Sequence, residues 1–424
     1  MNLPGSPHIA YRGDTLFIEG RSVAGLAQEY GTPLYVYSCA AMLESLAGYQ
    51  RALAGRDHLV CYAMKANSNL AVLQTFVRAG CGFDIVSAGE LDRALAAGAG
   101  ANRIVFSGVG KTRSDMRRAL DAGVLCFNVE SEAELVVLSG VAEACGRVAK
   151  VSLRVNPDVD AGTHPYISTG LKENKFGIAH ADTVAAYRRA AALPGIEIVG
   201  IDCHIGSQIT EVAPYLDALN RLLDLIELVE SGGISIPHID LGGGLGITYL
   251  DEEPPFAEAL IRTLLARIDS RGHGHRKILV EPGRSIVGNA GLLVSEVLYL
   301  KPGIERNFCI VDAAMNDLMR PALYEAWMGI VTCERRTTEP VRYDVVGPIC
   351  ESGDWLGRDR QLAVNAGDFI AVLSAGAYCM SMASNYNSRG RAAEVIVAGT
   401  VARLVRKREQ PEDLFRDELL LPDE

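Results

Sequence analysis

The chain has 424 residues and carries 41 Lys and Arg against 52 Asp and Glu, so its formal net charge is −11. This length corresponds to two or three domains of about 150 residues each. Hydrophobic residues make up 49% of the chain, which is enough for a large core and excludes a disordered protein. A net acidic chain without Lys/Arg blocks also argues against a nucleic-acid-binding protein.

The sequence shows no sign of export or membrane insertion. The opening MNLPGSPHIAYRGD lacks a basic stretch followed by an apolar one, and no window holds about 18 unbroken apolar residues. We therefore expect a cytoplasmic protein with no membrane contact. The ten cysteines have no metal-type spacing, so we expect reduced thiols, mostly in the core, and no metal site.

The chain begins with a predicted hairpin over residues 8–20 that turns at Gly13-Asp14. Eight short apolar, β-branched runs follow, and segments with helical spacing separate several of them. The runs are residues 58–64, 81–86, 103–108, 124–130, 150–155, 196–206, 238–244 and 277–283. Continuous apolar strands that alternate with amphipathic helices indicate a parallel sheet buried on both faces. Eight such units predict a (β/α)8 barrel, with an open doubly wound sheet as the alternative.

From about residue 290 the pattern changes to strands with few helices. The predicted strands are residues 291–300, 308–313, 341–347, 368–376 and 393–399. We expect a C-terminal β-sandwich or barrel-like domain over 287–424 that includes the N-terminal strands of residues 1–36, with the barrel over 37–286. The last stretch, from residue 404, is charge-dense, and we expect it to be partly helical or frayed.

The segment 156–178 is too long and irregular for an ordinary connection between a strand and a helix of the barrel. Loops of this length are usually functional or disordered. We expect it to cover the substrate.

In a (β/α)8 barrel the active site lies at the carboxyl ends of the strands. Nearly every predicted strand is followed there by a polar, ionisable or glycine residue. The set comprises Lys65, Asp84, Ser107, Asn128 or Glu130, Arg154, His204, the run Gly242–Gly244, and Glu281. A single such residue is often just a solvated strand end, but the whole set predicts a site.

Lys65 is the first of these residues that indicates chemistry. A lysine at a buried barrel mouth is costly unless it is paired or chemically engaged, and burial lowers the pKa of its amine towards a reactive form. The alternative is a lysine that extends along the rim to reach water. The glycine run allows backbone N–H groups to approach a phosphate, although a tight turn uses the same residues. Arg284 and Ser207 add a cation and a hydroxyl nearby.

A reactive amine, a phosphate-binding loop and a carboxylate at Glu281 together indicate a pyridoxal-phosphate site. In such a site the lysine joins the cofactor as a Schiff base, and the acid keeps the ring nitrogen protonated. His204 would then be an aromatic platform for the ring, with an ordinary buried histidine as the alternative.

Six separated motifs support this reading by resemblance. They are YAMKANSN around Lys65, CHIGSQ around His204, LGGGLGITY, EPGRSIVG, CESGD, and GAYCMSMASNYNSRGR. In this order, from about residue 10 to 400, they resemble the diaminopimelate decarboxylases among the fold-type-III pyridoxal-phosphate enzymes. The resemblance implies a barrel followed by a β domain.

The resemblance also implies a role for each matching residue. Lys65 would bind the cofactor covalently, with Cys350 as the proton donor. The cofactor-binding residues would be Lys65, Asp84, His204, Ser207, Gly243, Gly244, Glu281, Pro282, Gly283, Arg284 and Tyr378. The substrate contacts would be Arg284, Arg320, Tyr324, Glu351 and Tyr378. The family works as a homodimer in which the partner subunit supplies Cys350 and Glu351.

The implied reaction is decarboxylation of meso-2,6-diaminopimelate to L-lysine and CO2, the last step of lysine biosynthesis. Arg320 and Glu351 suit the distal carboxylate and ammonium groups of that substrate. Two alternatives stay open: a related decarboxylase of ornithine, arginine or a carrier-linked amino acid, and a racemase or non-catalytic cofactor-binding protein on the same fold.

Overall fold

The computed structural model describes residues 3–160 and 174–423, which form two compact units. One unit comprises residues 43–247 and 253–286, and the other comprises 1–42, 248–252 and 287–424. Residues 161–173, the centre of the segment expected to cover the substrate, lie outside the described part. Among the described helices, none is long and apolar enough to cross a membrane.

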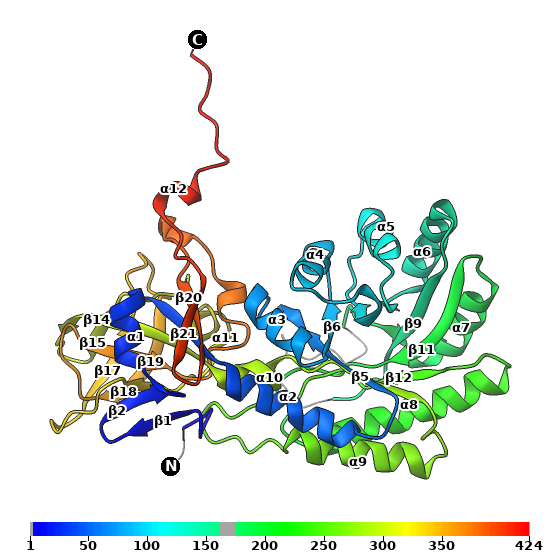
Figure 1. The fold of residues 1–424 in the computed structure, drawn as a ribbon, viewed down its shortest axis with the longest axis horizontal. Coiled ribbons are helices and arrows are strands. Elements are labelled where there is room, and N and C mark those ends of the chain that lie inside the picture. The colour runs from blue at the N-terminus through cyan, green and yellow to red at the C-terminus, as the bar shows by residue number, and fades with distance from the viewer. Residues whose placement is uncertain (1–2, 161–173, 424) are drawn as a thin grey trace. The chain divides into compact units, whose positions relative to one another are not determined.

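The first unit is a closed barrel of eight parallel strands (Figure 1). The strands are β5 (His58–Ala63), β6 (Gly82–Ile85), β7 (Ile104–Phe106), β8 (Cys126–Val129), β9 (Ala149–Asn156), β11 (Ile196–Asp202), β12 (His238–Asp240) and β13 (Lys277–Val280). Pairing of β8 with β9 closes the ring, and a short β10 (Ile178–Ala179) adds to β9. All eight predicted strands are present, so the (β/α)8 expectation is confirmed and the open sheet is excluded.

Helices surround these strands on the outside, as Figure 1 shows. They are α3 (Leu70–Arg78), α4 (Ala88–Ala96), α5 (Arg113–Ala122), α6 (Glu132–Cys145), α7 (Thr183–Ala192), α8 (Ala213–Ser231) and α9 (Ala257–Ser270). Local sequence fixes their ends. The side chains of Asn69 and Ser131 cap α3 and α6, and Gly123 and Gly146 end α5 and α6 in the left-handed conformation. The helix α2 (Cys39–Leu53) precedes β5 in the chain.

The floor of the barrel interior is apolar. Leu59, Cys61, Val105, Cys126 and Leu279 form one buried cluster there. Because side chains alternate along a strand, the residue two positions further on faces the same interior, nearer the carboxyl end. In β8 that residue is Asn128, and after β13 it is Glu281. Polar groups inside the barrel therefore stand above an apolar base.

The second unit consists mostly of strands. Its main sheet has the order β18-β17-β15-β14-β4-β20-β21, and β19 joins β14 to β16. The elements are β4 (Leu34–Ser38), β14 (Gly291–Lys301), β15 (Asn307–Val311), β16 (Ile330–Thr332), β17 (Val341–Val346), β18 (Trp355–Leu362), β19 (Phe369–Val372), β20 (Ala393–Ala398) and β21 (Val401–Arg406). The short helices α11 (Arg320–Tyr324) and α12 (Pro411–Leu414) belong to the same unit, whereas α10 (Arg284–Val287) lies at the end of the barrel unit.

N-terminal residues contribute to this β unit in two ways. β1 (Ile9–Arg12) and β2 (Thr15–Ile18) form the predicted hairpin and continue into β3 (Arg21–Ser22) and α1 (Val23–Tyr30). Their buried residues share one core with the main sheet, including Ile9, Leu16 and Leu292. β4 lies inside the main sheet, parallel to β20 and antiparallel to β14.

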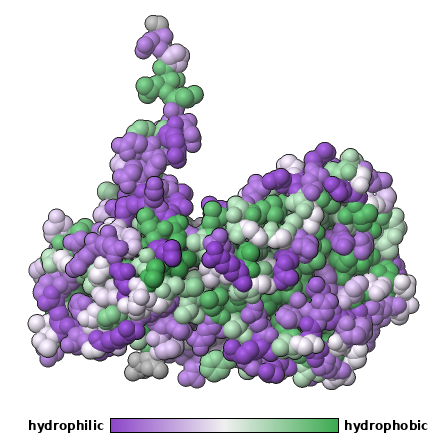
Figure 2. Space-filling view, viewed as in Figure 1, coloured by the Kyte–Doolittle hydropathy of each residue, from purple (hydrophilic) through white to green (hydrophobic). Residues whose placement is uncertain are grey.

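The C-terminal segment differs in part from the expectation. Residues 404–406 were expected to be helical or frayed. They belong instead to β21, where they continue the strand from Val401 and pair antiparallel with β20. Beyond α12 the segment carries Leu419, Leu420 and Leu421, which are 92–97% exposed and form the apolar group near the top of Figure 2.

Candidate active site

Lys65 follows β5 in a single turn of 3-10 helix, Met64–Ala66. Its Nζ donates a hydrogen bond to Asp84 Oδ2 at 3.1 Å. Asp84 lies in β6, in register with Ala63, and its carboxylate is fully buried, whereas the lysine side chain is 39% exposed. The hydrogen bond to the buried acid fixes the position of the amine, which does not extend along the rim to water. Its partial exposure leaves the amine accessible to a reactant.

His204 lies two residues beyond the end of β11 and is half-buried as a residue. The backbone N–H of Gly243 donates a hydrogen bond to its Nδ1 at 3.1 Å. Burial, with smaller contributions from Arg154 and Lys65, holds the pKa of His204 well below its usual value. Both observations make this imidazole neutral, with its Nδ1 unprotonated, which suits a flat aromatic surface and not a cation.

The glycine run after β12 makes a tight turn against neighbouring backbone. A Cβ atom at Gly243 would lie 2.1 Å from the carbonyl oxygen of Glu281, and Gly244 has a φ of +99°. The carbonyl of Gly242 accepts a hydrogen bond from the N–H of Glu281 at 2.7 Å. Larger residues therefore cannot replace Gly243 without moving the segment that carries Glu281.

The segment Glu281–Arg284 leads from β13 into α10. The carbonyl of Pro282 accepts a hydrogen bond from Ala63 N–H at 3.0 Å, and a Cβ atom at Gly283 would lie 3.2 Å from those of Ala63 and Ala66. The segment is thus held against the backbone on both sides of Lys65. At its end, Arg284 Nη2 donates to Ser207 Oγ at 3.1 Å, which brings a buried cation and a hydroxyl together.

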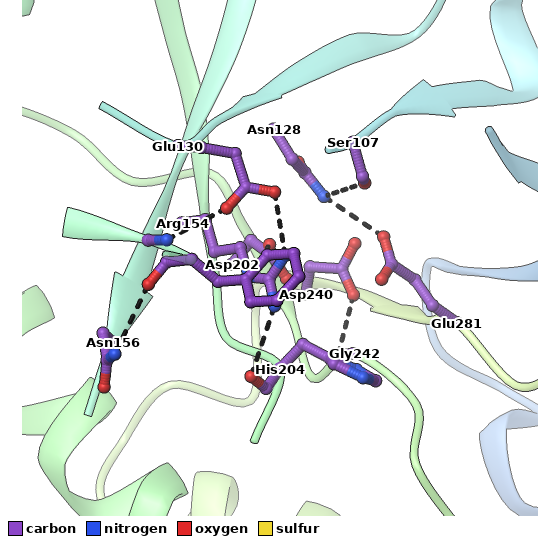
Figure 3. A network of polar contacts seen from close by, with 12 residues as sticks. Ser107, Asn128, Glu130, Arg154, Asn156, Asp202, His204, Asp240, Gly242 and Glu281 are labelled. Carbon is purple, nitrogen blue, oxygen red and sulfur yellow. Dashed lines mark hydrogen bonds and ion pairs between the residues drawn. The ribbon is translucent and has the colours of Figure 1, made fainter. Parts of the chain in front are cut away.

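Glu281 points into the barrel, and the residue is 5% exposed. Asn128 Nδ2 donates to Glu281 Oε1 at 3.1 Å and also to Ser107 Oγ (Figure 3). Burial, followed by the negative charges of Asp240 and Asp84, raises the pKa of Glu281 well above its usual value. The carboxyl therefore lies where a positive group would lower its energy.

A second part of this network surrounds Arg154 of β9 (Figure 3). Arg154 Nη1 donates to Glu130 Oε1 at 2.8 Å, and its Nε lies 4.0 Å from Asp202 Oδ2. Glu130 also accepts hydrogen bonds from the N–H groups of Gly108 and Gly177. This ion pair connects β9 with the loops that contain Gly108, Glu130 and Gly177, and it is buried on both sides.

The β unit holds the remaining predicted residues. Arg320 begins α11, is 7% exposed, and lies over the rings of Tyr249 and Tyr324 at 5.7 and 5.4 Å from their centroids. Aromatic contacts and burial thus hold the Arg320 guanidinium in one place.

Tyr378 has a φ of +55°, in the left-handed region that favours glycine. Such a conformation indicates a position that the surrounding structure fixes.

Cys350 and Glu351 lie in an exposed turn after β17. Asp354 fixes this turn, because its carboxylate accepts hydrogen bonds from the N–H groups of Met315 and Ile349, each at 2.7 Å. The N–H of Cys350 donates to Asn387 Oδ1 at 3.1 Å. All ten cysteines are free thiols, as predicted, and Cys350 is the exposed one.

Residues 40–288 match the family model of the pyridoxal-dependent decarboxylase, pyridoxal binding domain. This chain belongs to that family. Within the family, the relatives it resembles are diaminopimelate decarboxylases, which confirms the resemblance that the six motifs indicate. The enzyme of Pseudomonas aeruginosa is 58% identical over 97% of this chain and 99% of its own, and that of Vibrio cholerae is 52% identical over 96% and 97%.

Solved structures of the family agree in fold. Diaminopimelate decarboxylase from M. jannaschii in complex with L-lysine is 36% identical, covers 100% of this chain and 99% of its own, and has a TM-score of 0.94. The Helicobacter pylori enzyme with L-lysine is 41% identical over 93% and 98%, with a TM-score of 0.88. Both are similar over nearly the whole length, so the two-unit architecture is that of the family.

Two acids of the site escaped the sequence reasoning. Asp202 and Asp240 are the last residues of β11 and β12 and point into the barrel beside Glu281 (Figure 3). For these two strands the sequence pointed to His204 and the run Gly242–Gly244, which follow the acids in the chain. The signal was an Asp within an otherwise apolar strand, in IVGIDC and HIDLG.

Proposed function

We propose that this chain decarboxylates meso-2,6-diaminopimelate to L-lysine and CO2 with pyridoxal phosphate as cofactor, the last step of lysine biosynthesis. The observation that carries the proposal is the match to diaminopimelate decarboxylases, of which the Pseudomonas aeruginosa enzyme is 58% identical over 97% of this chain. L-Lysine, bound to two of the similar structures, is what remains when diaminopimelate loses one carboxylate.

The barrel residues suit this cofactor in charge and chemistry. Pyridoxal phosphate, when bound, supplies an aldehyde for an amine to join and a ring that accepts the electron pair left by departing CO2. We assign Lys65 to the aldehyde and Glu281 to the ring nitrogen. The fit is supported by the raised pKa of Glu281, because burial beside other acids favours a positive ring nitrogen there.

Other barrel residues would hold the rest of the cofactor. We assign His204 to the ring face and Asp84 to the position of the Lys65 amine. We assign the phosphate to the backbone and side chains of Ser207, Gly243, Gly244, Pro282, Gly283 and Arg284. We also assign Tyr378 of the β unit to the cofactor.

The substrate-binding residues belong largely to the β unit. Diaminopimelate carries a distal carboxylate and a distal ammonium, which we assign to Arg320 and Glu351, with Arg284, Tyr324 and Tyr378 as further contacts. An ornithine side chain carries only the ammonium, so a buried Arg320 would be left without an anion and would disfavour it. This observation favours diaminopimelate over the diamine-forming alternatives.

We assign the proton donor to Cys350, delivered by the partner subunit of a homodimer. The exposure of Cys350 and Glu351 in the single chain supports this arrangement, because a partner can then reach them. Coexpressed Lys65→Ala and Cys350→Ala chains should recover part of the activity that each lacks alone, whereas a site within one chain would recover none. We also propose a cytoplasmic location and a division into residues 1–36 and 287–424 against 37–286. The two compact units support the boundary at 286/287, whereas residues 37–42 and 248–252 group with the β unit.

The decisive experiment measures L-lysine and CO2 release from meso-diaminopimelate by the cofactor-loaded protein, with ornithine as the control substrate. We expect turnover of diaminopimelate alone. Borohydride reduction followed by peptide mass spectrometry should place the cofactor on Lys65, and Lys65→Ala should lose both the label and turnover, whereas the exposed Lys150→Ala should keep both. Conversion of stereocentres without CO2 release would identify a racemase instead.

A further inference from the structure

Three acidic side chains meet inside the barrel, at the ends of three neighbouring strands. Asp202 and Asp240 are register partners of β11 and β12, and Glu281 follows β13, the next strand. One carboxylate oxygen of each lies within 4.8 Å of the other two, and all three residues are buried. Figure 3 shows the three acids, with Asn128 joined to Glu281 by a hydrogen bond.

The cations nearby are committed elsewhere. Arg154 forms its ion pair with Glu130 at 2.8 Å and reaches Asp202 only at 4.0 Å. Lys65 forms its ion pair with Asp84. Among the described residues, no lysine or arginine forms an ion pair with Asp240 or Glu281. Three ionised carboxylates at this separation would repel one another strongly in a buried site.

Hydrogen-bond donors are also too few for three carboxylates. Glu281 Oε1 accepts from Asn128, and Asp240 Oδ1 accepts from the N–H of Gly242 at 2.9 Å. Within the described part of the chain, buried Asp202 Oδ1 and Asp240 Oδ2 have no donor. A buried carboxylate oxygen without a donor is costly, and a proton held between two carboxyl groups removes both the repulsion and the missing donor.

We propose that Asp202, Asp240 and Glu281 share a proton at neutral pH, and that Asp240 is a positioning residue that acts through Glu281. Burial raises the pKa of all three groups, that of Asp240 to about 6, which agrees with this arrangement. Because the three groups share one proton, Glu281 is ionised when Asp202 or Asp240 binds that proton.

The shared proton itself does not depend on the proposed function; only its role towards the cofactor does. A protonated ring nitrogen beside Glu281 would favour the ionised form of Glu281. The proton shared by the cluster would then lie on Asp240 or Asp202, so that Glu281 could ionise without water entering the barrel. The other titratable or charged groups around the cluster come from neighbouring barrel strands and from the loops that follow them. They are Cys61 of β5, Lys65 after it, Asp84 of β6, Cys126 of β8, Glu130 after it, Arg154 of β9, and His204 after β11.

The test follows the ionisation of Glu281 directly. We would label glutamate side-chain carboxyls with ¹³C, assign Glu281 by the resonance lost in Glu281→Gln, and titrate the full-length protein with and without cofactor. In Asp240→Asn, which keeps an oxygen for the Gly242 N–H, the midpoint of Glu281 should fall by about one pH unit or more. Asp202→Asn should shift it in the same direction, and serves if Asp240→Asn does not fold.

The matched control is Asp317→Asn in the β unit, which removes another buried acid but should leave the Glu281 midpoint unchanged. An unchanged or higher midpoint in both cluster variants would overturn the proposal. A stoichiometric cation in the purified holoenzyme that Asp240→Asn loses would also overturn it, because a metal would then neutralise the cluster. Absence of diaminopimelate turnover together with the expected shift would refute the proposed function alone.

Discussion

The backbone N–H of Gly243 and the Nδ1 atom of His204 form a 3.1 Å hydrogen bond between the loops after β12 and β11. This bond requires a lone pair on Nδ1, so any proton on the neutral ring lies on Nε2. The loop that we assign to the phosphate and the ring that we assign to the cofactor face are therefore fixed by the same contact.

His204 should stay neutral well below the pH at which an ordinary histidine titrates. Burial lowers its pKa in the folded state, so only the unfolded chain gains this proton as the pH falls through about 6.5. His204 therefore destabilises the fold increasingly with acidification below that point. Nitrogen NMR of ¹⁵N-histidine-labelled protein, with His204→Asn for assignment, checks this; a titration near pH 6.5 would contradict it.

Asp84→Asn should weaken the positioning of Lys65 without unfolding the barrel. The variant keeps the volume but loses the charge-assisted hydrogen bond at 3.1 Å, which is worth about 1.5–3 kcal/mol. We expect cofactor attachment or turnover to slow by about 10- to 100-fold. Stopped-flow absorbance after cofactor addition measures this, and an unchanged rate would show that Asp84 does not position the amine.

Arg320→Lys should distinguish a planar guanidinium from a simple positive charge. Arg320 is buried over two tyrosine rings, and a lysine there cannot form two parallel hydrogen bonds with a carboxylate. We expect kcat/KM for diaminopimelate to fall about 10-fold or more in Arg320→Lys and further in Arg320→Ala. An enzyme whose substrate lacks a distal carboxylate would be almost unaffected by either change.

Gly243→Ala should destabilise the protein and impair cofactor binding. The new Cβ atom would overlap the Glu281 carbonyl, and overpacking of this kind costs about 1–3 kcal/mol. Gly140→Ala is the control, because a Cβ atom at this exposed position in α6 meets no atom within 4 Å. Denaturant unfolding compares the two; equal stability would mean that the turn relaxes freely.

Asp317 gives a pH dependence of opposite sign to that of His204. Burial raises its pKa from 3.8 to about 6, so the folded state holds a proton that the unfolded state releases. The contribution of the Asp317 carboxyl to the free energy of unfolding is complete below about pH 4 and is lost as the pH rises through 6. The free energy of unfolding of the wild type relative to Asp317→Asn should thus fall by up to about 3 kcal/mol across that interval. A difference independent of pH would contradict this.

Much of the fold could be predicted because the barrel strands carry a strong local signal. Each of the eight is apolar, short and separated from the next by a segment long enough for a crossover. The strands β18 and β21 were missed because they carry exposed charged residues such as Arg358 and Arg403, which obscure a two-residue alternation, and β16 was missed because it has only three residues.

The site could be predicted most directly where a residue stands just beyond a strand. Lys65, His204 and Glu281 do so, and all three face the barrel mouth or its interior. Asp240 belongs to the strand itself, and its meaning depends on Asp202 in the neighbouring strand, a relationship of register that no local pattern reveals. The pairing of Asn128 with Glu281 depends likewise on the closure of the barrel.

The place of β4 in the main sheet affects how the chain is made. This strand leaves the ribosome early, but its two partners, β14 and β20, are synthesised only after the whole barrel. At about 5–20 residues per second, about 20–70 s pass between Ser38 and Val397. Both edges of β4 are unpaired for most of that time, so nascent chains interrupted before β20 would present a ready template for aggregation.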